Sequence, residues 1–171
     1  MRKPFSMEET NIVEIWLRRD SVRWMAGALA GAFAGLVAMA FAMILAVAAG
    51  HELWFPIKVA ALPILGNDAT AVGLTLGSIV VGLAAHQLLC IFLGVVFAHF
   101  TGTNSLAPLL GVGLVWGIFG WIFINNLFSR SFPAIRAAEL SVGAAFFVWI
   151  VYGLSLTSVS FFDRALRAKK A

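Results

Sequence analysis

Residues 69–129 read ATAVGLTLGSIVVGLAAHQLLCIFLGVVFAHFTGTNSLAPLLGVGLVWGIFGWIFINNLFS, sixty-one positions without an Asp, Glu, Lys or Arg. The stretches 24–50 and 140–162 are also free of these charges. About 20 apolar residues span the hydrocarbon core of a bilayer as a helix, so the three stretches hold two, one and one spans. We therefore predict an all-α integral membrane four-helix bundle, with spans at about 22–49, 69–100, 107–128 and 140–162.

The composition supports a membrane protein with one small bundle. Hydrophobic residues make up 61% of the 171 positions, and charged residues only 12%, whereas ordinary soluble domains carry roughly 25% charged residues. We expect a cytoplasmic or interfacial segment at 1–21, the membrane domain at 22–162 and a basic cytoplasmic tail at 163–171. The basic residues sit at two membrane edges and form no continuous face, so nucleic acid is not an expected partner.

Two segments are predicted to lie at the membrane surface or dip into it. Residues 6–19 resemble an amphipathic interfacial helix, because Ser6 and Glu9 fit a capping box and apolar residues recur at helical spacing behind them. Residues 53–66 are apolar but are interrupted by Pro56 and Pro63. They are too short to cross, and we expect an interfacial or re-entrant piece that leads to a cap at Asn67 or Asp68.

The lysines and arginines predict the orientation. With four spans both termini share one side, which holds nine basic residues against three on the other. This bias fits the positive-inside rule and predicts cytoplasmic N and C termini. The nine are Arg2, Lys3, Arg18, Arg19, Arg23, Arg164, Arg167, Lys169 and Lys170, and the three are Lys58, Arg130 and Arg136.

Glycines four residues apart predict close helix packing on three spans. Such GxxxG faces let two backbones approach where lipid offers no hydrophobic drive. We favour packing within one bundle, and docking to another protein's helix is the alternative. The glycines are Gly27, Gly31 and Gly35 on the first span, Gly73 and Gly77 on the second, and Gly113 and Gly117 on the third.

His86 and Gln87 are the most informative polar pair, since they fall near the middle of the second span. Polar groups at the bilayer centre usually face a bundle interior or cavity. His86 could serve as a proton relay, a haem or chlorin ligand, or a quinone contact. The favoured interpretation is a neutral histidine hydrogen-bonded between helices, with candidate partners Tyr152, Ser155 and Trp149.

No cofactor or metal site is predicted, although haem, chlorin or quinone at His86 stay open as alternatives. His51 and His99 fall at other depths than His86, so only Met39 or Met43 could complete a haem ligand set. Tryptophans well inside spans, such as Trp149, could line a quinone, lipid or pigment groove but more often form core. The chain shows no catalytic constellation. The predicted spans contain no acidic residue, which argues against a cation-coupled pump working alone.

The chain resembles uncharacterised bacterial four-span inner-membrane proteins of the YagU-like type. The resemblance rests on the glycine- and alanine-rich first span, on Leu53-Trp54-Phe55-Pro56-Ile57, on a histidine near Leu88 and Leu89, and on Val151-Tyr152-Gly153-Leu154. It implies a multi-pass protein of the bacterial inner membrane. It implies no activity, because the family has none agreed.

Three functions remain open from the sequence. The first is a non-catalytic accessory subunit of a larger bacterial membrane complex, respiratory or photosynthetic, with membrane lipids and other membrane-protein subunits as partners. The second is a small homo-oligomeric transporter or channel centred on His86. The third is a haem- or pigment-binding electron-transfer subunit.

Overall fold

The computed structural model describes residues 19–73, 75–124, 126, 129–131 and 141–169. All regular secondary structure in these ranges is helical. The elements are α2 (Ser21–Ala48), α3 (Phe55–Leu65), the short 3-10 helix η1 (Gly66–Thr70), α4 (Leu76–Phe100), α5 (Leu106–Phe123), α6 (Ser129–Ser131), α8 (Val142–Ser155), the 3-10 turn η3 (Leu156–Ser158) and α9 (Val159–Ala168).

Four helical segments are long and apolar enough to cross a membrane. They are α2, α4, α5 and the continuous run Val142–Ala168, which joins α8, η3 and α9. The chain is thus a multi-pass membrane protein, and the predicted all-α four-helix bundle is confirmed. The interfacial helix expected at 6–19 lies outside the described residues.

Two span boundaries differ from those predicted. The second span starts at Leu76 rather than at 69, because Gly66 and Gly73 have positive φ angles of 67° and 94° and break the helix between them. Asn67 and Asp68 belong to η1 and do not cap α4, which follows Thr75. The last span continues to Ala168 instead of ending at 162, and so brings Asp163 into the helix.

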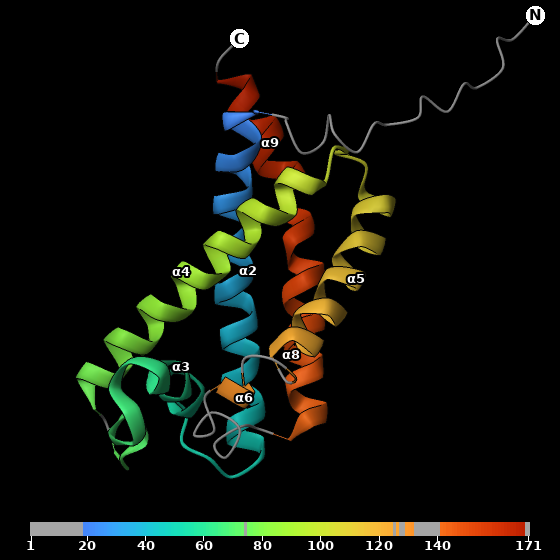
Figure 1. Cartoon of the computed structure of the whole chain (residues 1–171). Helices are drawn as coiled ribbons and strands as arrows, with labels where there is room; N and C mark the ends of the chain where they lie inside the picture. Colours follow the sequence, from blue (N-terminus) through green and yellow to red (C-terminus); the bar gives the residue numbers. More distant parts are fainter. Residues whose placement is uncertain (1–18, 74, 125, 127–128, 132–140, 170–171) are drawn as a thin grey trace, which may run out of the picture.

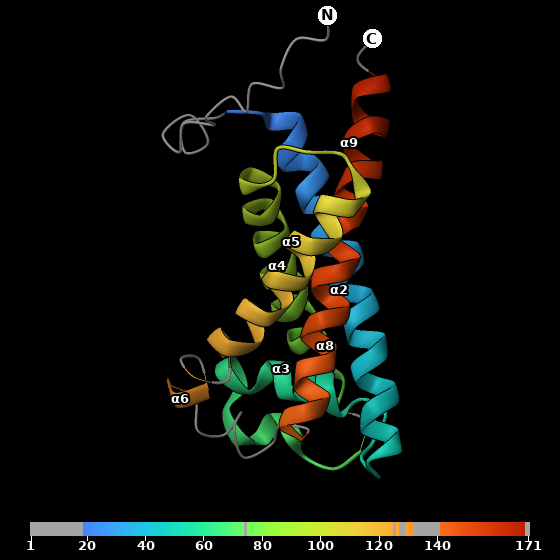
Figure 2. The same cartoon turned by 90° about the vertical axis from the view of Figure 1, so that its right-hand side faces the viewer.

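Helix α2 is the centre of the bundle. It packs along α4 on one side and along α8 and α9 on another, while α5 packs along α8 and α3 packs along α4. Figures 1 and 2 show the resulting arrangement, in which α2 lies between the slanted α4 and the α8–α9 run. The start of α2 and the end of α9 lie at the same end of the molecule, and α3 lies at the opposite end (Figure 1).

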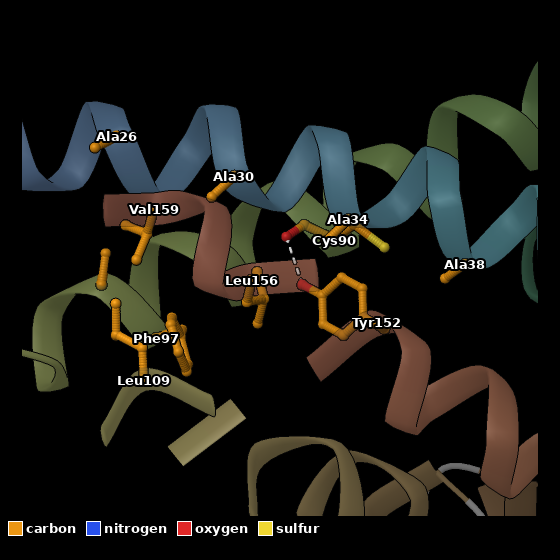
Figure 3. Close-up of a cluster of buried hydrophobic side chains, with 11 residues drawn as sticks. Ala26, Ala30, Ala34, Ala38, Cys90, Phe97, Leu109, Tyr152, Leu156 and Val159 are labelled. Atoms are coloured by element: carbon orange, nitrogen blue, oxygen red, sulfur yellow. Dashed lines mark hydrogen bonds between the residues drawn. The ribbon is translucent and has the colours of Figure 1, made fainter. Parts of the chain in front are cut away.

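Small residues on α2 allow these close contacts. Its alanines at positions 26, 30, 34 and 38 are buried and form one row, because residues four apart share a helix face. The row packs against Leu156 and Val159 and ends beside Tyr152 (Figure 3). Inside a bilayer such van der Waals packing replaces the hydrophobic drive that assembles soluble bundles.

The apolar segment 53–66 folds into α3 rather than crossing the membrane. Pro56 stands in its first turn, where a missing N–H costs nothing, and Gly66 ends it with a positive φ. Helix α3 lies against α4 at Gly82, where a side chain would collide with the carbonyl of Ile57. This contact holds α3 against the N-terminal part of α4, at the level of the lower ends of α2 and α8 in Figure 1.

Lys58 anchors α3 to the loop that precedes α4. Its side chain is only 1% exposed. The ammonium pairs with Glu52 at 2.7 Å and donates hydrogen bonds to the carbonyls of Ala71, at 2.8 Å, and Gly73. The Gly73 N–H in turn donates to Glu52 at 2.9 Å. A buried ammonium with three acceptors is stable there, since each of its protons has a partner.

A second polar network joins the helices at the opposite end. Arg23 of α2 is buried and donates to the Thr101 carbonyl at 3.2 Å and to the Asn104 side chain. It also lies 3.8 Å from the Asp163 carboxylate of α9. Asp163 accepts from Asn104 at 2.7 Å and from Arg167 at 3.1 Å. One carboxylate thus connects α2, the α4–α5 loop and α9.

Candidate functional site

His86 lies on α4 and faces α2. Its Nε2 atom is 3.0 Å from the carbonyl oxygen of Gly35, and the Cys90 Sγ atom, one turn along α4, is 3.5 Å from the same nitrogen. Gly35 has no side chain, so α4 comes close enough for this bond to form. The imidazole is therefore held between helices.

Gln87 points toward the same part of α2. Its Nε2 donates a long hydrogen bond of 3.5 Å to the Ala32 carbonyl. Its Oε1 is buried and has no hydrogen-bond partner in the part of the chain that the structure describes. His86 and Gln87 thus both meet backbone carbonyls of α2, which compensates part of the cost of burying them.

The expected partners of His86 in the last span were wrong. Tyr152 instead donates its hydroxyl hydrogen to the carbonyl of Cys90, at 2.8 Å, as Figure 3 shows. Trp149 packs its ring against the backbone at Gly120. Helix α8 therefore contacts α4 at Cys90, one turn beyond His86, because α4 crosses the bundle on a slant (Figure 1).

A pocket opens next to His86 at the level where α4 and α8 diverge. Its cavity volume is about 430 Å³. Helices α2, α3, α4 and α8 supply nearly all of its walls, and most of the lining is aliphatic or aromatic carbon. Among the described residues, polar atoms in the lining side chains come only from His86, Cys90, Trp149 and Tyr152, and no charged residue takes part. Such a cavity has the size and the apolar character of small-molecule sites.

Helix α3 forms the floor of this pocket. Phe55, Pro56, Val59, Ala60, Pro63 and Ile64 all line it. Residues 53–66 were expected to form an interfacial or re-entrant segment, and no role was predicted for them. The resemblance used Phe55 and Pro56 only as a pattern, and the structure gives both residues a place in the cavity wall.

The predicted glycine faces are used inside the chain where they form contacts. Added Cβ atoms at Gly27 and Gly31 would collide with the backbone of α4 at Gly94 and Cys90, and one at Gly35 would collide with Gln87 and Cys90. Glycines 113 and 117 meet α8 in the same way, at Gly153 and Trp149.

The prediction was wrong for the remaining pair of glycines. Gly73 stands in the turn before α4, and a Cβ at Gly73 or Gly77 would have no heavy atom within 4 Å. The spacing alone could not reveal this, because four-residue periodicity has meaning only where the chain is helical.

The three histidines have separate environments. His99 accepts a hydrogen bond from the Trp24 indole at 3.2 Å, and His51 stacks on Phe55 with ring centroids 4.3 Å apart. Met39 lines the pocket together with His86, whereas Met43 does not. Of the residues considered as haem ligands, only His86 and Met39 therefore line the same pocket.

Sequence reasoning missed Cys90 as a neighbour of His86, and it proposed Tyr152 as a direct partner, whereas Tyr152 lines the same pocket and bonds to Cys90. A signal existed for Cys90, which follows His86 by four residues and so shares its helix face. Comparisons of the chain with protein-family models, with curated proteins and with solved structures returned no match.

Proposed function

We propose that this protein is a non-catalytic membrane subunit that holds an apolar, membrane-dissolved molecule in the pocket beside His86. The observation that carries the proposal is the cavity of about 430 Å³ between α2, α3, α4 and α8, with its almost entirely apolar lining. A membrane protein can fill such a space only with lipid or with another hydrophobic molecule, because water gains few hydrogen bonds there.

Two features support a preformed site over a packing defect. Helix α3 is fixed in place by the buried Lys58 and its three acceptors, so the floor of the pocket is anchored. The opposite wall is tied to α4 by the Tyr152 hydroxyl. The first network fixes α3 to the loop before α4, and the second bond fixes α8 to α4.

The same proposal places the chain in a larger complex of the bacterial inner membrane, with both termini cytoplasmic. Large apolar side chains are exposed along α4 and α5, including Leu88, Phe92 and Phe119, and these surfaces are available to lipid or to partner helices. The glycine faces of α2 and α5 are occupied within the chain, so partners would bind elsewhere. A transporter or channel centred on His86, a haem- or pigment-binding subunit and the YagU-like resemblance stay predictions.

Neighbouring alanines on α4 provide the test. Ala85 lines the pocket, whereas Ala84 does not line it and is exposed. We expect a diazirine-bearing long-chain alkane probe in lipid nanodiscs to label pocket peptides of the wild type and of Ala84→Phe. Ala85→Phe should lose that labelling, because the added ring fills the cavity. Equal labelling of all three proteins, read by mass spectrometry, would refute the proposal.

Recovery of the protein from native membranes tests the complex. A mild-detergent purification should bring down defined membrane-protein subunits in constant ratio. A chain that elutes alone from native membranes would contradict the accessory-subunit part of the proposal and leave the pocket unaffected.

A further inference from the structure

The hydrogen bonding of His86 decides which of its ring nitrogens carries the proton. The carbonyl oxygen of Gly35, 3.0 Å from Nε2, can only accept a hydrogen bond. The proton must therefore reside on Nε2. In a neutral imidazole with its proton on Nε2, Nδ1 carries a lone pair and acts as an acceptor.

The pocket offers no charge that would keep the imidazole doubly protonated. Within the part of the chain that the structure describes, its lining contains no Asp or Glu, and its other polar side chains are those of Cys90, Trp149 and Tyr152. An unpaired charge in such surroundings is expensive. No hydrogen bond to Nδ1 is found among the described residues. His86, a residue of this apolar lining, thus has one acceptor, Nδ1, that no described residue uses.

Tyr152 adds a second acceptor to the same cavity. Its hydroxyl hydrogen is committed to the Cys90 carbonyl at 2.8 Å, which leaves the oxygen lone pairs as its remaining capacity. The Cys90 thiol is a weak donor and lies 3.5 Å from the His86 ring. Trp149 is the remaining strong donor in the lining, and its ring carbons pack against Gly120.

From these roles we infer that the bound molecule carries a hydroxyl group, which donates its hydrogen to His86 Nδ1. The inference rests on the proposed binding function and names the ligand class: an isoprenoid or other long-chain alcohol, or a prenylated phenol. The apolar chain fills the space over α3, and the hydroxyl supplies a donor to the remaining acceptor capacity of His86 and Tyr152. A carbonyl-bearing ligand, which the Trp149 indole would favour, is the competing outcome.

Matched ligands test the inference. The competitors of the photoreactive alkane in nanodiscs are a twenty-carbon isoprenoid alcohol, its methyl ether and the corresponding aldehyde, with a prenylated phenol and its methyl ether as a second arm. For the wild type we expect a hydroxyl compound to compete about tenfold better than its ether, because one unreplaced hydrogen bond is worth roughly that factor. The arm with the larger preference identifies the source of the hydroxyl.

Two variants separate recognition from folding. His86→Phe should abolish the preference for the hydroxyl while the ether still competes. Gln87→Met, the neighbour outside the pocket lining, should retain the preference. Nitrogen-15 NMR of histidine-labelled wild-type protein should show the tautomer protonated at Nε2, independently of any variant.

The possible outcomes test the hydroxyl-bearing ligand separately from the proposed binding of an apolar molecule. Equal competition by alcohol and ether in the wild type, better competition by the aldehyde, or a tautomer protonated at Nδ1 would overturn the hydroxyl assignment and leave apolar binding standing. If no compound displaces the probe, and the probe does not label the pocket, the proposed function falls together with the inference.

Discussion

Single glycines determine how closely the helices of this bundle approach. At Gly31 the backbone of α4 leaves no room for a side chain, since a Cβ would collide with the Cys90 carbonyl and lie 3.0 Å from the Ile91 Cα. At Gly77 the surroundings are open. Both glycines belong to a four-residue glycine spacing, but only at Gly31 would an added side chain collide with a neighbouring helix.

We predict that Gly31→Ala destabilises the protein and that Gly77→Ala does not. Overpacking a tight contact costs about 1–3 kcal/mol, whereas alanine in an open helical position has a propensity advantage of up to about 1 kcal/mol over glycine. Thermal unfolding in detergent measures both. Equal melting temperatures for Gly31→Ala and the wild type would mean that α2 and α4 are not in contact there.

The Asp163 side chain connects α9 to α2 and to the α4–α5 loop. Its side chain is buried, and it accepts from Asn104 and Arg167 while facing Arg23. The predicted spans end at position 162 and contain no acidic residue, so Asp163 was expected in the tail. The structure corrects this, because α9 continues the last span and carries Asp163 against α2.

We predict that Asp163→Ala is strongly destabilising. Removing one member of a buried ion pair costs about 3–5 kcal/mol, and the variant also takes the shared carboxylate acceptor away from Asn104 and Arg167. Arg164→Ala is the matched control, because this neighbouring side chain is exposed and hydrogen-bonds only within α9. Unfolding in a denaturing detergent series compares the two. Similar stability of both variants would contradict a structural role for the Arg23–Asp163 pair.

At the scale of elements, α3 depends on the Glu52–Lys58 pair. The hydrogen bond from Lys58 holds the pKa of the Glu52 carboxyl below its ordinary value, and the Gly73 N–H adds to the effect. A carboxyl whose pKa is lowered by folding stabilises the fold above its unfolded pKa. This stabilisation disappears as the pH falls through the folded pKa.

We therefore predict that Glu52→Gln lowers the melting temperature at neutral pH. The difference from the wild type should shrink once the pH falls below the ordinary pKa of a glutamate and close below the lowered pKa of folded Glu52, where the wild-type carboxyl is protonated as well. Melting curves at several pH values test this, and the comparison of the two proteins removes the contribution of other carboxyls. A constant difference across the whole range would exclude the ion pair as its source.

At the scale of the whole molecule, the two ends of the bundle differ in charge and in accessibility. The described end of α9 carries the exposed Arg164, Arg167 and Lys169, and Arg19 precedes α2 at the same end. The opposite end holds α3, η1 and the exposed Asn67, with Lys58 buried. The positive-inside rule assigns the first end to the cytoplasm.

We predict that Asn67→Cys reacts with a membrane-impermeant maleimide in intact spheroplasts and that Lys169→Cys does not. Both are made in a Cys90→Ala background, because Cys90 is the only native cysteine. Permeabilised spheroplasts serve as the control, in which both positions should be labelled. Labelling of both in intact spheroplasts, or of Lys169→Cys alone, would reverse or refute the topology.

The sequence by itself determined the solvent, the helical class and the number of spans. Uncharged apolar runs of this length have one physical solution, a helix that satisfies its own backbone in lipid. The glycine and alanine rows of α2 were also readable, because a four-residue repeat defines one face of a helix wherever the helix is continuous.

Only the tertiary structure decided which faces meet and what lies between them. The pocket beside His86 exists because α4 crosses α2 on a slant and separates from α8, with α3 closing the gap below. Local periodicity contains no information about crossing angles. The partners of His86, Lys58 and Asp163 are mainly backbone carbonyls or side chains from other elements. Such carbonyls are present at every position, so no residue pattern marks the ones that folding brings close.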